Sequence, residues 1–309
     1  MGRVAAVDCG TNSIRLLVAD VADTGALCDV HREMRVVRLG QGVDATGRLV
    51  PAAIERTRVA LTDYARVLRR TGVDRVRMVA TSATRDASNR DDFFEMVRAV
   101  LGVEAEVITG DEEARLSFTG AVAELVPADG PFVVVDLGGG STELVLGDAD
   151  GVQAAFSANV GCVRLTERFL ETDPPTAGEV AAADTATREV LAAAFAAVPV
   201  ERARTWVGVA GTMTTLAAVA AGMSRYDPDA IHRSRVPLAR LHEVCTDLVA
   251  MTREQRAALG PMHPGRADVI GGGALVTRVL AEELAARAGI TELVVSEHDI
   301  LDGIALALG

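Results

Sequence analysis

The sequence predicts a two-domain α/β protein. Its 309 residues exceed what one hydrophobic core usually supports, so we expect two domains of roughly 100–200 residues each. Apolar residues make up 49% of the chain but aromatic residues only 3%, so the cores must be built mainly from alanine, valine and leucine. Such side chains suit helices packed on buried strands better than an aromatic-rich all-β protein.

Two pairs of short apolar runs, each around a polar turn, predict two β-hairpins. The turns read Asp-Cys-Gly-Thr-Asn-Ser and Asp-Leu-Gly-Gly-Gly-Ser, and the two segments align without a gap at an offset of 128 residues, so that Asp8 matches Asp136. An internal repeat of this kind predicts two related halves that each contribute one hairpin loop to a shared cleft, where ligands usually bind. The flanking runs are Val4–Val7, Ile14–Ala19, Phe132–Val135 and Leu144–Leu146.

The rest of the chain alternates between helices and strands, which is the α/β pattern. We expect Thr212 to be the N-cap residue of the helix that follows the predicted strand over 206–210. The repeat, together with Pro127 and Gly130, places the domain boundary near residues 120–130. Helices are predicted over 54–70, 91–101, 177–197, 266–284 and at the end of the chain to Leu308, and strands over 76–80, 105–108, 206–210 and 293–295.

The charge composition limits the partners that the chain can have. The formal net charge is −12, so we expect neither nucleic acid nor an anionic membrane surface as a partner. All 31 basic residues are arginine, which excludes a P-loop lysine and a Schiff-base mechanism. A phosphate group would therefore be bound by arginine, hydroxyl groups, backbone N–H groups or a metal ion.

The cysteines and the N-terminus predict a cytoplasmic protein. The four cysteines form no C-x-x-C pair and are too few for a disulfide framework. Asp8 lies where a signal peptide would be apolar, so export is not expected. The uncharged stretch Thr205–Ser224 is about long enough to span a bilayer, but its glycines and threonines favour a buried strand, a turn and a packed helix.

The turn between Asp136 and Glu143 is the sharpest functional signal. Its glycines let the backbone bring several N–H groups close to an anion, and the two hydroxyl residues add donors. Both carboxylates stand at the strand ends, where they could hold Mg²⁺, which prefers oxygen ligands. A glycine-rich hairpin with one capping aspartate is the alternative. The phosphate-binding candidates of this loop are Gly138, Gly139, Gly140, Ser141 and Thr142.

The N-terminal loop is the counterpart of this turn. Arg15 stands at the position that matches Glu143, where a guanidinium could bind phosphate oxygens through two parallel hydrogen bonds. Its alternative role is that of an outward strand residue. The phosphate-binding candidates here are Asp8, Gly10, Thr11, Asn12, Ser13 and Arg15.

Three further segments carry candidate residues. Glu112 and Glu113 lie at a strand-to-helix junction, where carboxylates could serve hydrolysis or merely stabilise a helix N-terminus. Arg85 lies in a hydroxyl-rich stretch that suits phosphate binding or a surface turn. Gly211 and Thr212 offer a helix N-terminus to an anion, or simply a capped helix. The five histidines show no metal-ligand spacing, so we expect structural or surface roles for His31, His232, His242, His263 and His298.

Together these segments resemble the exopolyphosphatase and guanosine pentaphosphate phosphatase family, within the actin, Hsp70 and sugar-kinase superfamily. The resemblance spans nearly the whole chain and lies in eight motifs in family order. They are VDCGTNSIRLLV within 4–18, TSATRDASN at 81–89, TGDEEARLSFTG at 109–120, DLGGGSTEL at 136–144, GCVRLTERF at 161–169, GTMTTLAA at 211–218, GRADVI at 265–270 and SEHDILDGIA at 296–305.

The resemblance implies an architecture and roles for the candidate residues. It implies two actin-like, ribonuclease H-like domains with an interdomain cleft: residues 1–124, on which the last helix at 299–309 packs back, and residues 125–298. Glu113 would activate water, with Glu112 as a less favoured substitute, and the metal ion, Mg²⁺ or else Mn²⁺, would be bound by Asp136 and Glu143. Phosphate would be bound by both loops and by Gly211 and Thr212, with Arg85 and Arg266 as cationic clamps.

The function implied is Mg²⁺-dependent hydrolysis of the terminal phosphate of inorganic polyphosphate. The alternatives are hydrolysis of the 5′-phosphate of pppGpp, a non-catalytic sensor of polyphosphate or alarmones, and a kinase of the same superfamily. A homodimer and inhibition by ppGpp or pppGpp are further expectations. Thr11 replaces the usual serine of the first loop and keeps its hydroxyl. Longer relatives carry an extra helical domain for which this sequence shows no counterpart, so chain-length preference and processivity stay open.

Overall fold

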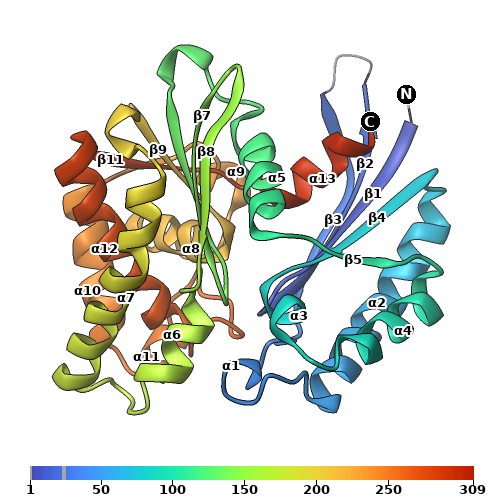
Figure 1. The fold of residues 1–309 in the computed structure, drawn as a ribbon, viewed down its shortest axis with the longest axis horizontal. Coiled ribbons are helices and arrows are strands. Elements are labelled where there is room, and N and C mark those ends of the chain that lie inside the picture. Colours follow the sequence, from blue (N-terminus) through green and yellow to red (C-terminus); the bar gives the residue numbers. More distant parts are fainter. Residues whose placement is uncertain (1, 23–25) are drawn as a thin grey trace. The chain divides into compact units, whose positions relative to one another are not determined.

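The structure, a computed structural model, describes residues 2–22 and 26–309 of the chain (Figure 1). It consists of two compact units. Unit 1 contains the residues up to Gly120 together with Ile300–Gly309, and unit 2 contains Ala121–Asp299. Each unit is built on one β-sheet with helices packed on it.

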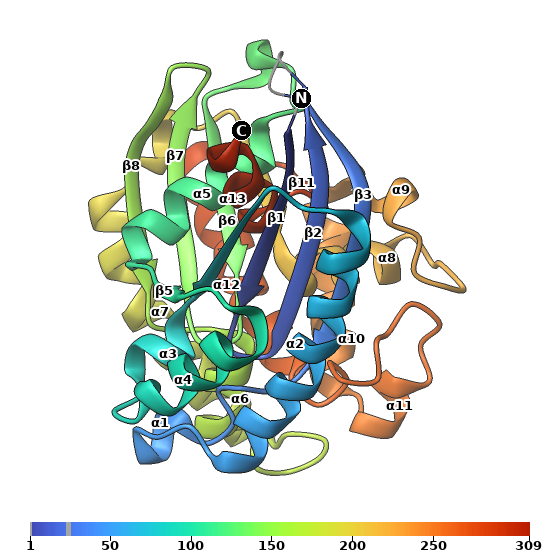
Figure 2. The same cartoon turned by 90° about the vertical axis from the view of Figure 1, so that its right-hand side faces the viewer.

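The sheet of unit 1 has five strands in the order β3-β2-β1-β4-β5 (Figure 2). β1, β2 and β3 are antiparallel neighbours, whereas β4 runs parallel to β1, and β5 runs parallel to β4. The strands are β1 (Gly2–Cys9), β2 (Ser13–Val21), β3 (Leu27–Val36), β4 (Arg75–Ala80) and β5 (Ala105–Val107). The helices are α1 (Val43–Thr46), α2 (Pro51–Thr71), α3 (Ser82–Asp86), α4 (Arg90–Leu101), α5 (Gly110–Val122) and α13 (Ile300–Leu308).

Strand β1 is buried on both faces. Ala5 and Val7 belong to a core shared with α2 and α4, while Val4 and Ala6 belong to a second core shared with α13. Successive side chains of a strand point to opposite faces, so both sets must be apolar. This double burial explains why the strand appears in the sequence as an unbroken apolar run.

Helix α13 joins unit 1 through a close backbone contact and a buried ion pair. A Cβ at Gly303 would lie 1.9 Å from the carbonyl oxygen of Leu116 in α5, so only glycine permits this approach. Arg32 of β3 donates hydrogen bonds of 2.5 and 3.2 Å to the two carboxylate oxygens of buried Asp302. Burial of the Arg32 guanidinium opposes its charge, but the carboxylates of Asp302 and Asp29 outweigh this and raise the pKa of Arg32.

Removing the arginine of this pair is expected to destabilise the protein. Arg32→Met leaves the Asp302 carboxylate buried without its cation, which should cost about 2–4 kcal/mol, because Arg32 is itself partly exposed. Urea unfolding of the two proteins measures the difference. Arg58→Met is the matched control, since it breaks an exposed pair with Glu55 that is worth about 0–1 kcal/mol. Equal effects of the two substitutions would contradict the anchoring role of Arg32.

The sheet of unit 2 has six strands in the order β10-β11-β9-β6-β7-β8. The strands are β6 (Phe132–Leu137), β7 (Thr142–Asp148), β8 (Gly151–Ala158), β9 (Thr205–Val209), β10 (Arg235–Pro237) and β11 (Glu292–Val295). The helices are α6 (Cys162–Phe169), α7 (Ala177–Ala197), α8 (Ala210–Ala220), α9 (Pro228–Ile231), α10 (Leu238–Ala250), α11 (Arg253–Ala257) and α12 (Ile270–Ala288).

The two sheets repeat one topology. Reading β8-β7-β6-β9-β11 in unit 2 against β3-β2-β1-β4-β5 in unit 1 gives the same strand order, with an antiparallel first half and a parallel second half in both. The hairpins also share a register, because Asp8 pairs with Arg15 and Asp136 pairs with Glu143. The structure therefore confirms the internal repeat and the α/β class predicted from the sequence.

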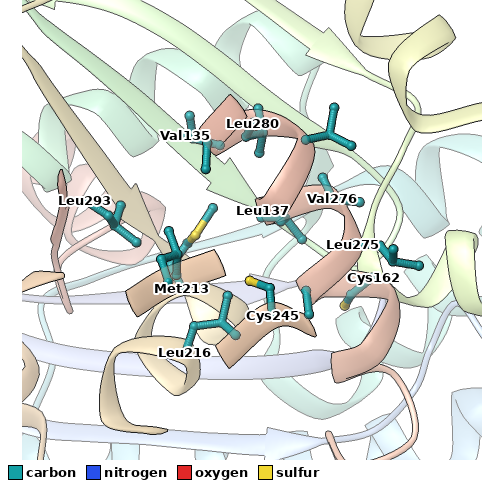
Figure 3. Close-up of a cluster of buried hydrophobic side chains, with 14 of the residues drawn as sticks. Val135, Leu137, Cys162, Met213, Leu216, Cys245, Leu275, Val276, Leu280 and Leu293 are labelled. Carbon is teal, nitrogen blue, oxygen red and sulfur yellow. The ribbon is translucent and has the colours of Figure 1, made fainter. Parts of the chain in front are cut away.

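The core of unit 2 lies between the sheet and helices α6, α8, α10 and α12 (Figure 3). Most of its side chains are aliphatic or contain sulfur, as the low aromatic content predicts. Trp206, which is fully buried, and Phe195 of α7 are aromatic members of this core. The labelled residues are Val135 and Leu137 of β6, Cys162 of α6, Met213 and Leu216 of α8, Cys245 of α10, Leu275, Val276 and Leu280 of α12, and Leu293 of β11.

Most predicted elements are confirmed, and the errors are informative. β3 and β8 were not expected, and α12 begins at Ile270 rather than at 266, because residues 263–269 form turns. Thr212 is not a cap: Val209 precedes α8, and Thr212 lies buried within its first turn. Thr205–Ser224 forms β9 and α8, as expected. Among the described residues, no helix combines the length and apolarity that a membrane span needs.

Candidate active site

The loop between β1 and β2 holds the first group of candidate residues in unit 1. The Gly10 N–H donates to the Ser13 carbonyl over 2.9 Å, which closes the turn. The carbonyls of Thr11 and Asn12 accept hydrogen bonds from the backbone of residues 37–40. A Cβ at Gly40 would lie 2.3 Å from the Thr11 side chain, so Gly40 permits this contact. The turn is thus fixed by a neighbouring segment.

At the base of this loop Arg15 binds Asp8. The Arg15 Nε and Nη2 atoms donate to Asp8 Oδ2 over 3.0 and 2.7 Å. The two residues are directly opposed in the hairpin register, so their side chains lie on the same face of the sheet. The structure therefore places the predicted phosphate ligand Arg15 in an ion pair at the strand ends.

The second group in unit 1 centres on Glu113. Its carboxylate is buried in the first turn of α5, and Oε2 accepts a hydrogen bond of 3.0 Å from Arg85 Nη1. The same Nη1 also donates to the carbonyl of Ile108 over 2.9 Å. These two bonds fix the guanidinium, which in turn fixes the carboxylate. Arg85, expected as a phosphate clamp, is thus found orienting Glu113.

The neighbouring Glu112 lies in a different environment. Its side chain is 43% exposed, against 10% for Glu113, and Oε1 accepts a 2.6 Å hydrogen bond from Arg77 of β4. Arg77 also binds Glu106 of β5. Glu112 is therefore part of a surface ion-pair network along the edge of the sheet, on another side of α5 from Glu113.

In unit 2 the glycine loop after β6 is closed by the start of α6. The Gly138 N–H donates to the Ser141 carbonyl over 3.0 Å, as Gly10 does to Ser13 in unit 1. The carbonyls of Gly138 and Gly139 accept from the first N–H groups of α6, at residues 162–164. Since the loop carbonyls are bound in this way, backbone donors are what the loop can offer to an anion.

Asp136 and Glu143 form a carboxylate pair beside this loop. They are directly opposed in the register of β6 and β7, and both are buried. Ser157 of β8 donates to Glu143 Oε1 over 2.7 Å and so orients it. In unit 1, Arg15 stands at the position that Glu143 has in unit 2. A cation therefore faces Asp8, whereas a second carboxylate faces Asp136. Like charges in directly opposed positions repel, and this all-oxygen donor set fits Mg²⁺ or Mn²⁺.

The start of α8 is the last predicted element of the site. β9 runs into α8 without a loop, and Ala210 has a φ of 69°, a strained conformation for a residue with a Cβ and one that occurs often at functional sites. The Arg266 guanidinium lies over Gly211, and its Nη1 donates to Thr215 Oγ1 over 3.2 Å. A helix N-terminus beside a guanidinium is a favourable anion site. Thr212 lies in the same turn.

Gly211 is required for the position of Arg266. A Cβ at residue 211 would lie 2.4 Å from Arg266 Cζ, so Gly211→Ala must displace the guanidinium. We expect binding of inorganic triphosphate, measured by calorimetry, to weaken about tenfold or more, because a charge-assisted hydrogen bond is lost. Gly178→Ala, in the first turn of α7, is the control, since its Cβ meets nothing within 4 Å. Unchanged binding in Gly211→Ala would refute this role.

Two supporting residues gave no signal in the sequence. Ser157 orients Glu143 from β8, a strand that was not predicted. Arg256 is buried and donates to the carbonyls of Leu248, Met251 and Ala267, and burial lowers its pKa. Through Ala267 it holds the turn that carries Arg266. Only tertiary contacts reveal such roles, because neither residue belongs to a motif.

Comparisons with known proteins identify the family of this chain. A model of the Ppx/GppA phosphatase family matches residues 17–308. Exopolyphosphatase 2 of Mycobacterium tuberculosis is 66% identical over 99% of this chain and 98% of that protein. The guanosine-5′-triphosphate,3′-diphosphate pyrophosphatase of Aeromonas salmonicida is 32% identical over 91% of this chain and 55% of that protein.

A solved structure of a member of this family is also similar to this chain. The crystal structure of the Aquifex aeolicus member of the Ppx/GppA family superposes with a TM-score of 0.81 and 33% identity, over 99% of this chain and 97% of that one. The repeated topology described above is thus that of the two-domain actin-like fold. The match of the family model over nearly the whole chain, together with the 66% identity, shows that this chain belongs to the Ppx/GppA phosphatase family.

Proposed function

We propose that this phosphatase is an exopolyphosphatase, which hydrolyses the terminal phosphate of inorganic polyphosphate and releases orthophosphate. The full-length identity to Exopolyphosphatase 2 supports this choice of substrate. The structural observation that carries the proposal is the buried carboxylate of Glu113, which Arg85 holds in one orientation. Hydrolysis needs such a group to position water and accept its proton.

In the proposed reaction, the oxygen of a water molecule attacks the terminal phosphorus. A new P–O bond forms, the anhydride P–O bond to the next phosphate breaks, and the shortened polyphosphate leaves with the electron pair. Glu113 accepts the proton of the attacking water. Arg85 supports this role, because its hydrogen bond orients the Glu113 carboxylate. Glu112 is engaged with Arg77 and fits the role less well.

Phosphate oxygens are bound, in this proposal, by backbone N–H groups and cations that are already in place. The loops at residues 10–13 and 138–142 and the start of α8 supply N–H and hydroxyl donors, and Arg266 supplies charge. Arg15, paired with Asp8 at the base of the first loop, would add positive charge there. Donors held by the fold need no reorganisation when charge develops on the phosphoryl group.

The carboxylate pair is the proposed metal site. Asp136 and Glu143 would hold Mg²⁺, or Mn²⁺, with Ser157 keeping Glu143 in position. A bound divalent cation would neutralise charge on the phosphoryl oxygens. In unit 1 the position that corresponds to Glu143 is occupied by Arg15, so the carboxylate pair is a feature of unit 2.

The second candidate substrate is pppGpp, and the similarity to the Aeromonas salmonicida enzyme favours it. Phosphate release from short polyphosphate, long polyphosphate and pppGpp, each with Mg²⁺, distinguishes the candidates. The proposal expects the highest kcat/KM on polyphosphate. A preference for pppGpp would replace it with the second candidate, and binding of either compound without phosphate release would show a sensor.

The setting proposed for the enzyme is the cytoplasm. All four cysteines are free thiols, and three of them are buried, which suits a reducing compartment. Inhibition by alarmones and a homodimeric state stay predictions of the family resemblance.

A further inference from the structure

Three side chains outside the phosphatase residues come together in unit 2. Glu124 follows α5, His232 follows α9, and His298 precedes α13. One ligand atom from each lies within 4.8 Å of the others. Glu124 is 108 residues from His232 and 174 from His298, so no local spacing could have revealed the cluster from the sequence. The prediction that these histidines have structural or surface roles did not anticipate it.

The two imidazole rings face the carboxylate of Glu124 from neighbouring positions. His232 Nε2 lies 3.3 Å from Glu124 Oε2, and His298 Nδ1 lies 3.8 Å from Oε1. The ring centroids are 4.6 Å apart with an interplanar angle of 32°. The geometry points to a metal site: we propose that Glu124, His232 and His298 bind a divalent transition metal of the Zn²⁺, Co²⁺ or Ni²⁺ class.

The donor set selects this class of metal over Mg²⁺. Two imidazoles and one carboxylate are typical ligands of zinc and its neighbours, whereas Mg²⁺ prefers oxygen donors alone. Three protein ligands leave at least one coordination position for water. The site therefore differs in chemistry from the all-oxygen pair of Asp136 and Glu143.

The backbone holds both histidines in place. The Arg233 N–H donates to the Val295 carbonyl over 2.7 Å, and the Val295 N–H donates to the Ser234 carbonyl over 3.0 Å. These bonds tie the segment after His232 to the end of β11, three residues before His298. The Ser296 Oγ accepts from the N–H of His298 and donates to its carbonyl. Ligands held in this way lose little freedom when an ion binds.

The exposure of the three side chains also suits a metal ion. The Glu124 side chain is 49% exposed, His298 30% and His232 14%, so an ion can enter from solvent.

Binding must change one hydrogen bond of His232. The N–H of Glu297 donates to His232 Nδ1 over 3.2 Å, so in the metal-free ring the proton lies on Nε2, facing Glu124. Coordination through Nε2 moves this proton to Nδ1 and breaks the bond from Glu297, at a cost of about 1 kcal/mol. Three-ligand coordination exceeds this cost, because structural zinc sites supply roughly 10 kcal/mol or more.

The site lies close in sequence to both places where the chain passes from one unit to the other. Glu124 follows Gly120 by four residues, and His298 precedes Ile300 by two. A metal ion bound here would join these two segments of unit 2. The inference is independent of the proposed function, since none of its three residues belongs to the phosphatase groups described above.

The test is a Zn²⁺ titration of the full chain in competition with a chromogenic chelator, with Mg²⁺ present in excess to occupy oxygen sites. We expect the wild type to bind one Zn²⁺. Glu124→Gln and His298→Gln should bind it at least about tenfold more weakly, since losing a ligand costs no less than losing a group that only hydrogen-bonds a ligand. His242→Gln, an exposed histidine of α10, is the control and should bind as the wild type does.

A wild-type measurement guards against variants that fail to fold. With only five histidines in the chain, imidazole NMR signals can be followed during Zn²⁺ or Co²⁺ addition, and those of His232 and His298 should shift or broaden first. Equal Zn²⁺ affinity in the wild type, Glu124→Gln and His298→Gln would overturn the proposal. So would a first response from the other three histidines.

Discussion

Glu113→Gln is expected to lower kcat for phosphate release by roughly 10²–10⁴-fold. Glutamine has nearly the same shape but cannot accept a proton from water, so catalysis falls while the fold is kept. The ion pair with Arg85 becomes a hydrogen bond from Arg85 to the amide oxygen, which preserves the position of the side chain. Steady-state kinetics on polyphosphate should show KM changing far less than kcat.

Glu112→Gln is the matched control for this experiment. The two glutamates are adjacent in sequence and in one helical turn, but Glu112 is half exposed and bound to Arg77 at the edge of the sheet. Its substitution should change kcat by less than about fivefold, because an exposed pair contributes at most about 1 kcal/mol. If Glu112→Gln loses the activity and Glu113→Gln retains it, the assignment of the two residues is wrong.

The sequence could not separate these two glutamates, and the reason is physical. Both lie in the first turn of α5, where any carboxylate is favoured by the helix dipole. What distinguishes them is the partner that each meets: Arg85 from α3 for one, Arg77 from β4 for the other. Partners of this kind depend on how helices and strands pack, which no local pattern encodes.

The hairpin repeat, in contrast, could be predicted almost completely. The apolar runs around the two polar turns fix strands, register and face, because side chains alternate along a strand and the turn sets the pairing. The opposed pairs Asp8 with Arg15 and Asp136 with Glu143 follow from that register. β3 and β8 were missed because their residues are half exposed and mixed in polarity, so they lack a clear apolar pattern.

Asp136→Asn and Glu143→Gln are expected to impair activity by altering its metal dependence. Each removes one negative ligand from the proposed Mg²⁺ site, so the Mg²⁺ concentration for half-maximal activity should rise at least about tenfold. The cation stabilises the charge of the transition state by several kcal/mol, so kcat at saturating substrate should fall roughly 10²-fold or more when the cation is lost. A Mg²⁺ titration of phosphate release measures both quantities.

The control for the metal experiment is Asp148→Asn. Asp148 ends β7, the strand on which Glu143 lies, and it hydrogen-bonds Gln153 and the N–H of Asp150 instead of facing the glycine loop. Asp148→Asn should leave the Mg²⁺ dependence unchanged. The comparison with Asp136→Asn and Glu143→Gln therefore distinguishes the loss of a metal ligand from the loss of a negative charge on the strand. Should Asp136→Asn show the wild-type Mg²⁺ curve with a lower kcat, the carboxylate would act on substrate or water rather than on the metal, and the ion would have to be bound elsewhere.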